Sequence, residues 1–105
     1  MTTTSGMIEA IERILNRGGG DAEVLRAVVE AIHDRGVEWV AIRAHGETFA
    51  AGAPRTDSQR VRIAYSGEPV GELEAVVDDD AFLERVAVLI SAHVKRHHAG
   101  EPWSP

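Results

Sequence analysis

At 105 residues the chain is long enough for one globular domain, and a domain of this size buries roughly 60–65% of its unfolded surface. Its net charge of −6 and the lack of any basic stripe argue against a nucleic-acid partner. The absence of cysteine excludes thiol catalysis, thiolate-bound metal and disulfides.

The chain shows no signal peptide and no membrane span. No basic segment is followed by an apolar run at the N-terminus, and no apolar stretch approaches the ~20 residues that cross a bilayer. We therefore expect a cytoplasmic protein without a membrane partner.

Two amphipathic helices are predicted first. Residues 6–17 follow Ser5, a suitable N-cap, and end at Gly18–Gly20. Asp21 is expected to cap the second helix, which closes at Gly36. The two apolar stripes are Met7, Ile8, Ile11, Ile14 and Leu15, and then Val24, Leu25, Val28, Val29 and Ile32. Because a twelve-residue helix is marginal alone, the first helix must dock on another element.

Four strands are predicted next. Residues 37–43 are apolar on both faces, which suggests a central place in a sheet. Residues 44–46 form a turn, and residues 47–51 return as a short strand. After a loop at 52–58, residues 59–77 alternate in the manner of two strands joined by a tight turn.

The register of this second hairpin can be predicted from the side-chain pattern. A two-residue loop, Ser66–Gly67, would set Val61 opposite Glu72, whereas a three-residue loop, Ser66–Glu68, would set it opposite Leu73. Because a one-residue slip moves every side chain to the other face, we predict the three-residue loop. The other opposed pairs in that register are Arg62 with Glu72 and Arg60 with Glu74.

A last helix is predicted over residues 81–98, after Asp78–Asp80. Three carboxylates could attract a divalent cation, but aspartates at a helix start are expected from capping, and we favour capping. The helix carries the stripe Phe82, Leu83, Val86, Leu89, Ile90, His93 and Val94. Val88 widens this stripe, so the helix should contact both the sheet and a second helix, from this chain or from a partner.

The histidines do not make a strong case for metal. His93 and His97 are four residues apart, and His98 adjoins them, but zinc would still need a third protein ligand. His33 and His45 are interpreted as surface residues. We predict no metal site and no cofactor. A single domain over residues 6–98 is expected between flexible ends at 1–5 and 99–105.

Three stretches together resemble a GAF domain. Residues 21–32 followed by 36–42 are similar to that family's opening helix and first strand, residues 65–76 to its late hairpin, and residues 80–90 to its closing helix. The resemblance implies an α+β fold: a four-stranded antiparallel sheet in the order 2-1-4-3, with residues 37–43 central and the N- and C-terminal helices on one face. It also implies a regulatory domain of signalling proteins that often binds a small molecule on the other face and dimerises through its helices.

The chain departs from the family between its second strand and the late hairpin. The family usually has a long pocket-covering segment there, and only residues 52–58 remain. The face that would form the pocket floor is mostly charged, whereas small-molecule pockets are mostly apolar. Its candidate ligand-binding residues are Trp39, Arg43, Arg60, Arg62, Glu72 and Glu74.

Two functional hypotheses follow. In the first, a reduced sensory domain binds a small anionic or planar ligand, with the three arginines holding a carboxylate and Trp39 stacking on it. In the second, a ligand-free protein–protein interaction module dimerises through its terminal helices, with Ile8, Ile11, Leu15 and Val88 as the candidate interface. We do not expect an enzyme, because no nucleophile–base pair or metal constellation stands out.

Overall fold

The computed structural model describes residues 5–44 and 46–99, and the side chains of residues 6–44 and 46–96. In chain order the elements are α1 (Ser5–Arg17), α2 (Asp21–Asp34), β1 (Trp39–Ala44), β2 (Glu47–Gly52), β3 (Gln59–Tyr65), β4 (Glu68–Ala75) and α3 (Asp80–Ala99). The first residue of α1 and the last of α3 were predicted to belong to the flexible ends, and the rest of those ends lies outside the described residues.

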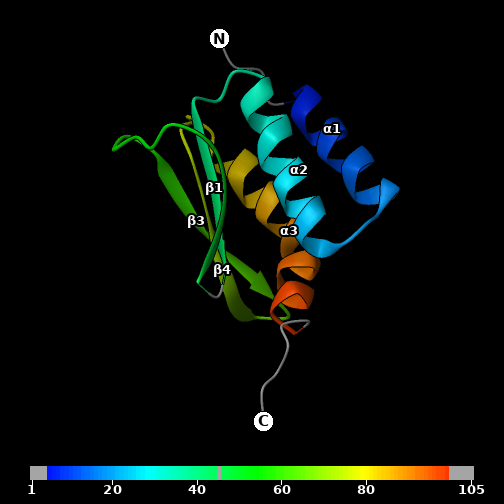
Figure 1. The fold of residues 1–105 in the computed structure, drawn as a ribbon. Helices are drawn as coiled ribbons and strands as arrows, with labels where there is room; N and C mark the ends of the chain where they lie inside the picture. Colours follow the sequence, from blue (N-terminus) through cyan, green and yellow to red (C-terminus); the bar gives the residue numbers. More distant parts are fainter. Residues whose placement is uncertain (1–4, 45, 100–105) are drawn as a thin grey trace.

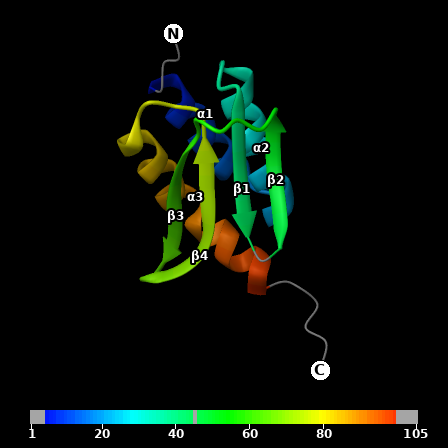
Figure 2. The same ribbon diagram turned by 90° about the vertical axis from the view of Figure 1, so that its left-hand side faces the viewer.

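The four strands form one antiparallel sheet in the order β2-β1-β4-β3. All three helices lie on the same face of this sheet, and the other face is open (Figures 1 and 2). The α+β class, the strand order and the one-sided placement of the terminal helices are therefore confirmed. β1 and β4 are central, and β2 and β3 are the edges.

The helices form two layers above the sheet. α2 packs on β1 and β2, and α3 packs on β3 and β4, whereas α1 packs on α2 and α3 (Figure 1). The core fills both interfaces, because apolar stripes of all three helices meet the inward side chains of the strands. Among its fully buried members are Met7, Ile11, Leu25, Ile32, Ile42, Ile63, Leu73, Leu83 and Ile90. Within the described ranges, no helix combines the length and apolarity needed to cross a membrane.

Two predicted helix caps are wrong. Ser5, predicted as the N-cap of the first helix, is itself a helical residue of α1. Gly20, in extended conformation, is the N-cap of α2, and Asp21 is its first helical residue, so the cap predicted for Asp21 is wrong. Asp79 does cap α3, because its Oδ1 accepts a hydrogen bond of 3.0 Å from the amide of Phe82. The capping interpretation of the aspartate run is confirmed at this residue.

The register of the β3–β4 hairpin is the predicted one, but its loop is shorter than predicted. Val61 faces Leu73. Tyr65, however, pairs with Glu68, so only Ser66 and Gly67 connect the strands. Both have positive φ, 53° and 85°, as in the two-residue turns whose twist matches that of the strands. The other predicted pairs are also present, Arg62 with Glu72 and Arg60 with Glu74.

A bulge in β4 reconciles the short turn with the register. Ile63 pairs with Gly71 but Ala64 pairs with Pro69, which leaves Val70 as an extra residue. Proline has no amide to donate to the ladder and is tolerated at a bulge. Val70 is buried in the core as a result, while Tyr65 lies beyond the bulge and is exposed.

Candidate functional site: a buried carboxylate network on the open sheet face

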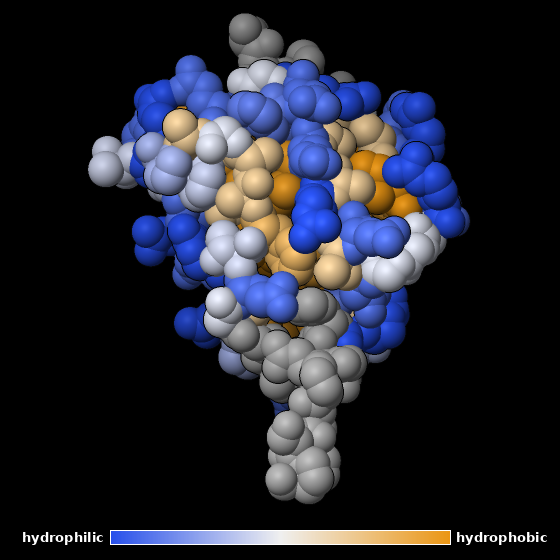
Figure 3. Space-filling view, viewed as in Figure 1, coloured by the Kyte–Doolittle hydropathy of each residue, from blue (hydrophilic) through white to orange (hydrophobic). Residues whose placement is uncertain are grey.

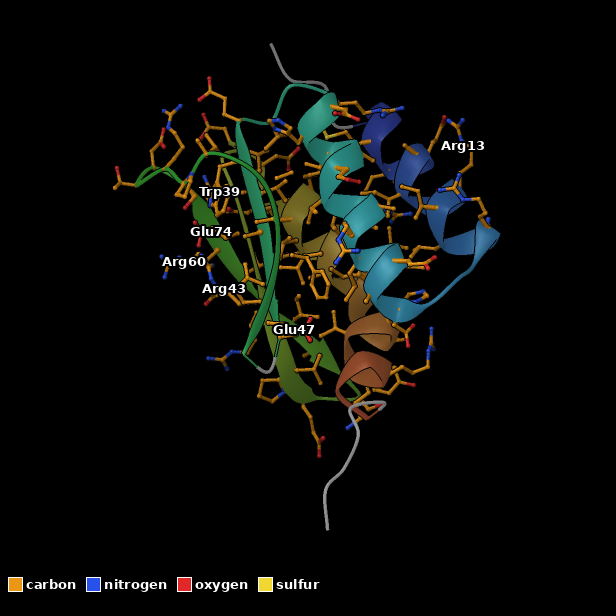
Figure 4. All side chains as sticks on the ribbon, viewed as in Figure 1. Arg13, Trp39, Arg43, Glu47, Arg60 and Glu74 are labelled. Atoms are coloured by element: carbon orange, nitrogen blue, oxygen red, sulfur yellow. The ribbon has the colours of Figure 1, made fainter. Side chains whose placement is uncertain are left out.

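The six candidate ligand-binding residues share the sheet face opposite the helices. Figure 4 shows Trp39, Arg43, Arg60 and Glu74 on that side. The ladder explains this gathering: β4 contributes its two glutamates between β1, which contributes Trp39 and Arg43, and β3, which contributes Arg60 and Arg62. Alternation along three neighbouring strands thus places both carboxylates between cationic side chains.

Glu74 is the centre of the cluster. Its Oε2 accepts hydrogen bonds from Nε1 of Trp39 at 2.7 Å and from Oγ of Ser58 at 2.8 Å. Its Oε1 accepts a hydrogen bond from Nη1 of Arg43 at 2.6 Å and lies 3.2 Å from Nε of Arg60. One carboxylate therefore binds groups from β1, from β3 and from the residue that precedes β3.

The environment keeps this carboxylate charged. Glu74 is only 3% exposed, and burial by itself would raise its pKa by removing water from the charged form. Hydrogen bonds from Arg43, Trp39 and Ser58, together with the charge of Arg43, outweigh burial and lower the pKa of Glu74 from 4.5 to about 2. At neutral pH Glu74 is thus an acceptor only, and all of its partners can donate.

The connection between β2 and β3 completes the network. It crosses the sheet at the end where β1 begins (Figure 2) and brings Ser58 to Glu74. Arg55 holds this connection by ion pairs to Asp57, at 2.9 Å, and to Glu38. Ser58 was missed in the sequence analysis, because a loop has no periodic pattern that would assign its hydroxyl to a face.

The geometry changes the role expected for Trp39. The residue is 6% exposed and its indole N–H is bound to Glu74, so its ring is not an open stacking platform and that expectation is wrong. Arg43 and Arg60 are bound to Glu74 as well. Glu72 lies at the rim, with a side chain 43% exposed and 3.6 Å from Arg43. The exposed Arg62 makes no ion pair within the described part of the chain.

The candidate dimer-interface residues differ in how far they are exposed. Ile11 is fully buried in the core of the single chain, so it has no surface to offer a second copy and must be removed from the predicted interface. Ile8 and Leu15 are partly buried against the core. Val88 is 71% exposed on α3.

A second polar cluster joins the start of α2 to the end of α3. Oδ1 of Asp21 lies 2.9 Å from Nδ1 of His93 and 3.3 Å from Nε of Arg96. His33 is a surface residue, and its Nδ1 lies 2.8 Å from the carbonyl oxygen of Val37. Among the side chains that the structure describes, no three histidines or carboxylates gather as a metal site would require. The other histidine side chains, those of His45, His97 and His98, lie outside that set.

The strand order and the helix placement agree with what the resemblance to GAF domains implies about the fold. Membership of that family stays a prediction. No protein-family model, no curated protein and no solved structure matches this chain.

Proposed function

We propose that this chain is a GAF-like regulatory domain without catalytic activity, which acts by contact with another protein rather than by binding a small molecule on its sheet. One observation carries the proposal. The groups that would hold a ligand, the indole of Trp39 and the guanidinium groups of Arg43 and Arg60, are already bound to Glu74.

A ligand anion would have to compete with Glu74 for these donors. Displacing Glu74 would leave a charged carboxylate buried without partners, which costs several kcal/mol. Glu74 is also tethered in place by β4, so its effective concentration at the donors exceeds that of a free metabolite. Both effects favour the protein–protein hypothesis over the sensory one.

A second candidate function rests on Arg62. This side chain is exposed beside Arg60 and has no ion-pair partner in the described part of the chain. A small anion could bind at this rim without displacing Glu74. The sensory hypothesis therefore survives at Arg62 and Arg60, not at the buried part of the cluster.

Thermal shift and native mass spectrometry distinguish the two candidates. We expect no copurified small molecule, and no saturable rise in melting temperature with a panel of mono- and dicarboxylates and nucleotides. A saturable shift that is lost in Arg62→Gln would overturn the proposal in favour of the sensor. Arg17→Gln, an exposed arginine at the end of α1, is the matched control and should behave like the unmodified protein.

Val88→Asp tests the contact predicted on the terminal helices. Since Val88 is exposed, the substitution should leave the fold intact and act on association only. Sedimentation velocity would report a loss of self-association if α3 is the contact surface. Ile11→Asp is unsuitable for this purpose, because a charge at a fully buried position would unfold the chain.

A further inference from the structure

β2 presents an unpaired backbone edge. The amide of Ala53 donates to the carbonyl of Glu38, and the amide of Val76 donates to that of Trp39. In an antiparallel sheet the backbone groups of successive residues point alternately to the two neighbouring strands, so every second residue of β1 bonds to β2 and the others bond to β4. The same alternation turns the backbone groups of Thr48 and Ala50 away from β1. No described element lies beyond β2 to receive them (Figure 2).

The two edge strands of the sheet differ in how well they are protected against pairing with a strand of another chain. On β3, the exposed arginines Arg60 and Arg62 stand along the edge strand, and such charges oppose pairing with another chain. β2 has the sequence Glu-Thr-Phe-Ala-Ala-Gly, with neither lysine, arginine nor proline, and its outward residues Thr48 and Ala50 are small and exposed. Of the two edges in the described part of the chain, β2 is therefore the less protected against strand addition.

An apolar surface surrounds this edge. Figure 3 views the molecule from the side of β2 and α2 and shows apolar residues gathered over these two elements, with hydrophilic residues around them and across the middle of the area. On β2 the apolar side chains include Phe49, which is buried, Ala50, which is exposed, and Ala51, which is half-buried. Arg26 of α2 lies 6.0 Å above the ring of Phe49. A strand added to β2 would cover this surface.

We infer that the occupant is a second copy of this chain, paired antiparallel through β2 about a two-fold axis at Ala50. Because Thr48 and Ala50 carry the free backbone groups, Ala50 faces Ala50 of the second copy and Thr48 faces Gly52. Phe49 then faces Ala51 of the second copy, so a large side chain meets a small one. The two sheets become one, with both open faces on the same side.

Charges on α2 are complementary in this arrangement. Arg26 lies near Phe49, and His33, in the last turn of α2, lies near Gly52. Later residues of α2 therefore lie beside later residues of β2, so the two elements run in the same direction. The two-fold axis reverses that direction and brings Arg26 of one copy toward Glu30 of the other. Neither residue has an ion-pair partner in the described part of the chain, and both are exposed. A pair that is repeated by symmetry favours a second copy over an unrelated partner.

Hydrogen exchange by NMR tests the pairing at single residues. This inference rests on the proposed function in one respect: it identifies the protein that the chain contacts as a second copy of the chain. The amides of Thr48 and Ala50 have no neighbouring strand to accept them among the described residues, so we expect their exchange to slow as protein concentration rises. Fast exchange at every concentration would overturn the inference.

Variants locate the interface by sedimentation velocity. Ala50→Pro removes an outward amide and should raise the dimer dissociation constant about tenfold or more. The charge variants Arg26→Glu and Glu30→Arg should each weaken the dimer, and the double variant should restore it. This second test does not depend on the proline variant, which could lose the dimer by disturbing the fold. A wild-type monomer at all concentrations, or a double variant that fails to restore a dimer weakened by the single variants, would contradict the inference.

Val88→Asp separates this inference from the proposed function. We expect it to leave the dimer intact. A dimer dissolved by Val88→Asp but not by Ala50→Pro would move the contact to α3, overturning the β2 pairing while preserving an interaction module. A ligand-induced thermal shift lost in Arg62→Gln would instead overturn the proposed function and leave the β2 pairing untouched.

Discussion

The indole nitrogen of Trp39 lies 2.7 Å from Oε2 of Glu74, although the two residues are 35 positions apart in the chain. This hydrogen bond joins the first residue of β1 to Glu74, the central residue of the cluster on the open sheet face. Removing the carboxylate would leave the indole N–H buried without an acceptor and would leave Arg43 and Arg60 without their shared counter-charge.

Glu74→Ala should therefore lower the free energy of unfolding by about 2–3 kcal/mol. Urea denaturation at neutral pH measures the change. The matched control is Glu72→Ala on the same strand and face, whose carboxylate is half-exposed and only loosely paired, and we expect a loss below about 0.5 kcal/mol. Equal losses for the two variants would show that burial of Glu74 has no energetic weight.

Acid should weaken the fold through Glu74. Its pKa is about 2 in the folded chain against an ordinary 4.5, so between these values the unfolded state binds more protons than the folded state. The stabilisation is complete above about pH 4.5 and is lost as the pH falls toward 2. It amounts to at most about 3 kcal/mol.

Glu74→Gln provides the comparison for this pH dependence. The difference in unfolding free energy between the wild-type protein and this variant should shrink as the pH falls from 5 toward 2. The other carboxylates titrate in both proteins and cancel. A difference that stays constant across this range would contradict the lowered pKa.

Gly71 is required by the close approach of β4 to β1. A Cβ at this position would lie 2.6 Å from the carbonyl oxygen of Arg43 and 3.2 Å from Cγ1 of Val94. Because a strand backbone cannot yield as a flexible side chain can, Gly71→Ala should cost about 2–3 kcal/mol of unfolding free energy. Gly6→Ala in α1, where a Cβ meets nothing within 4 Å, should be neutral or stabilise by up to about 1 kcal/mol.

Asp79 should contribute to stability as the N-cap of α3. Asp79→Ala removes the acceptor for the amide of Phe82 and should lower the melting temperature, with a loss of about 1 kcal/mol. Asp78→Ala, at the exposed preceding aspartate, should change stability by less than about 0.5 kcal/mol. If Ca²⁺ or Mg²⁺ raised the melting temperature of the wild-type protein but not of Asp79→Ala, the capping interpretation would be incomplete.

Alternation along the strands predicted which side chains share a face, because the period of two follows from the backbone itself. It therefore gathered the six candidate residues and set Val61 opposite Leu73 correctly. The same pattern could not reveal the bulge at Val70, which shifts the pairing by one residue between Ile63 and Ala64. Pro69 was the available signal, since a proline within a strand points to an edge or a bulge.

The exposure of a side chain was harder to predict than the face of the sheet on which it lies. Trp39 and Glu74 were expected on an open surface, and both are buried. The loop residue Ser58, which has no periodic partner, proved to be part of the network that surrounds them. The stripe of α1 was also recognised, but periodicity does not say whether a stripe packs on a sheet or, as here, on other helices.

The strand order has a consequence for the order of folding. β1 with β2 and β3 with β4 are local hairpins, whereas the pairing of β1 with β4 closes a loop of some thirty residues and must meet a larger entropic cost. Glu74 on β4 and its partners Trp39 and Arg43 on β1 lie across that seam. The contacts that neutralise charge on the open face would thus form when the two hairpins dock. If docking follows the rate-limiting step of folding, substitutions at Glu74 should speed unfolding more than they slow folding.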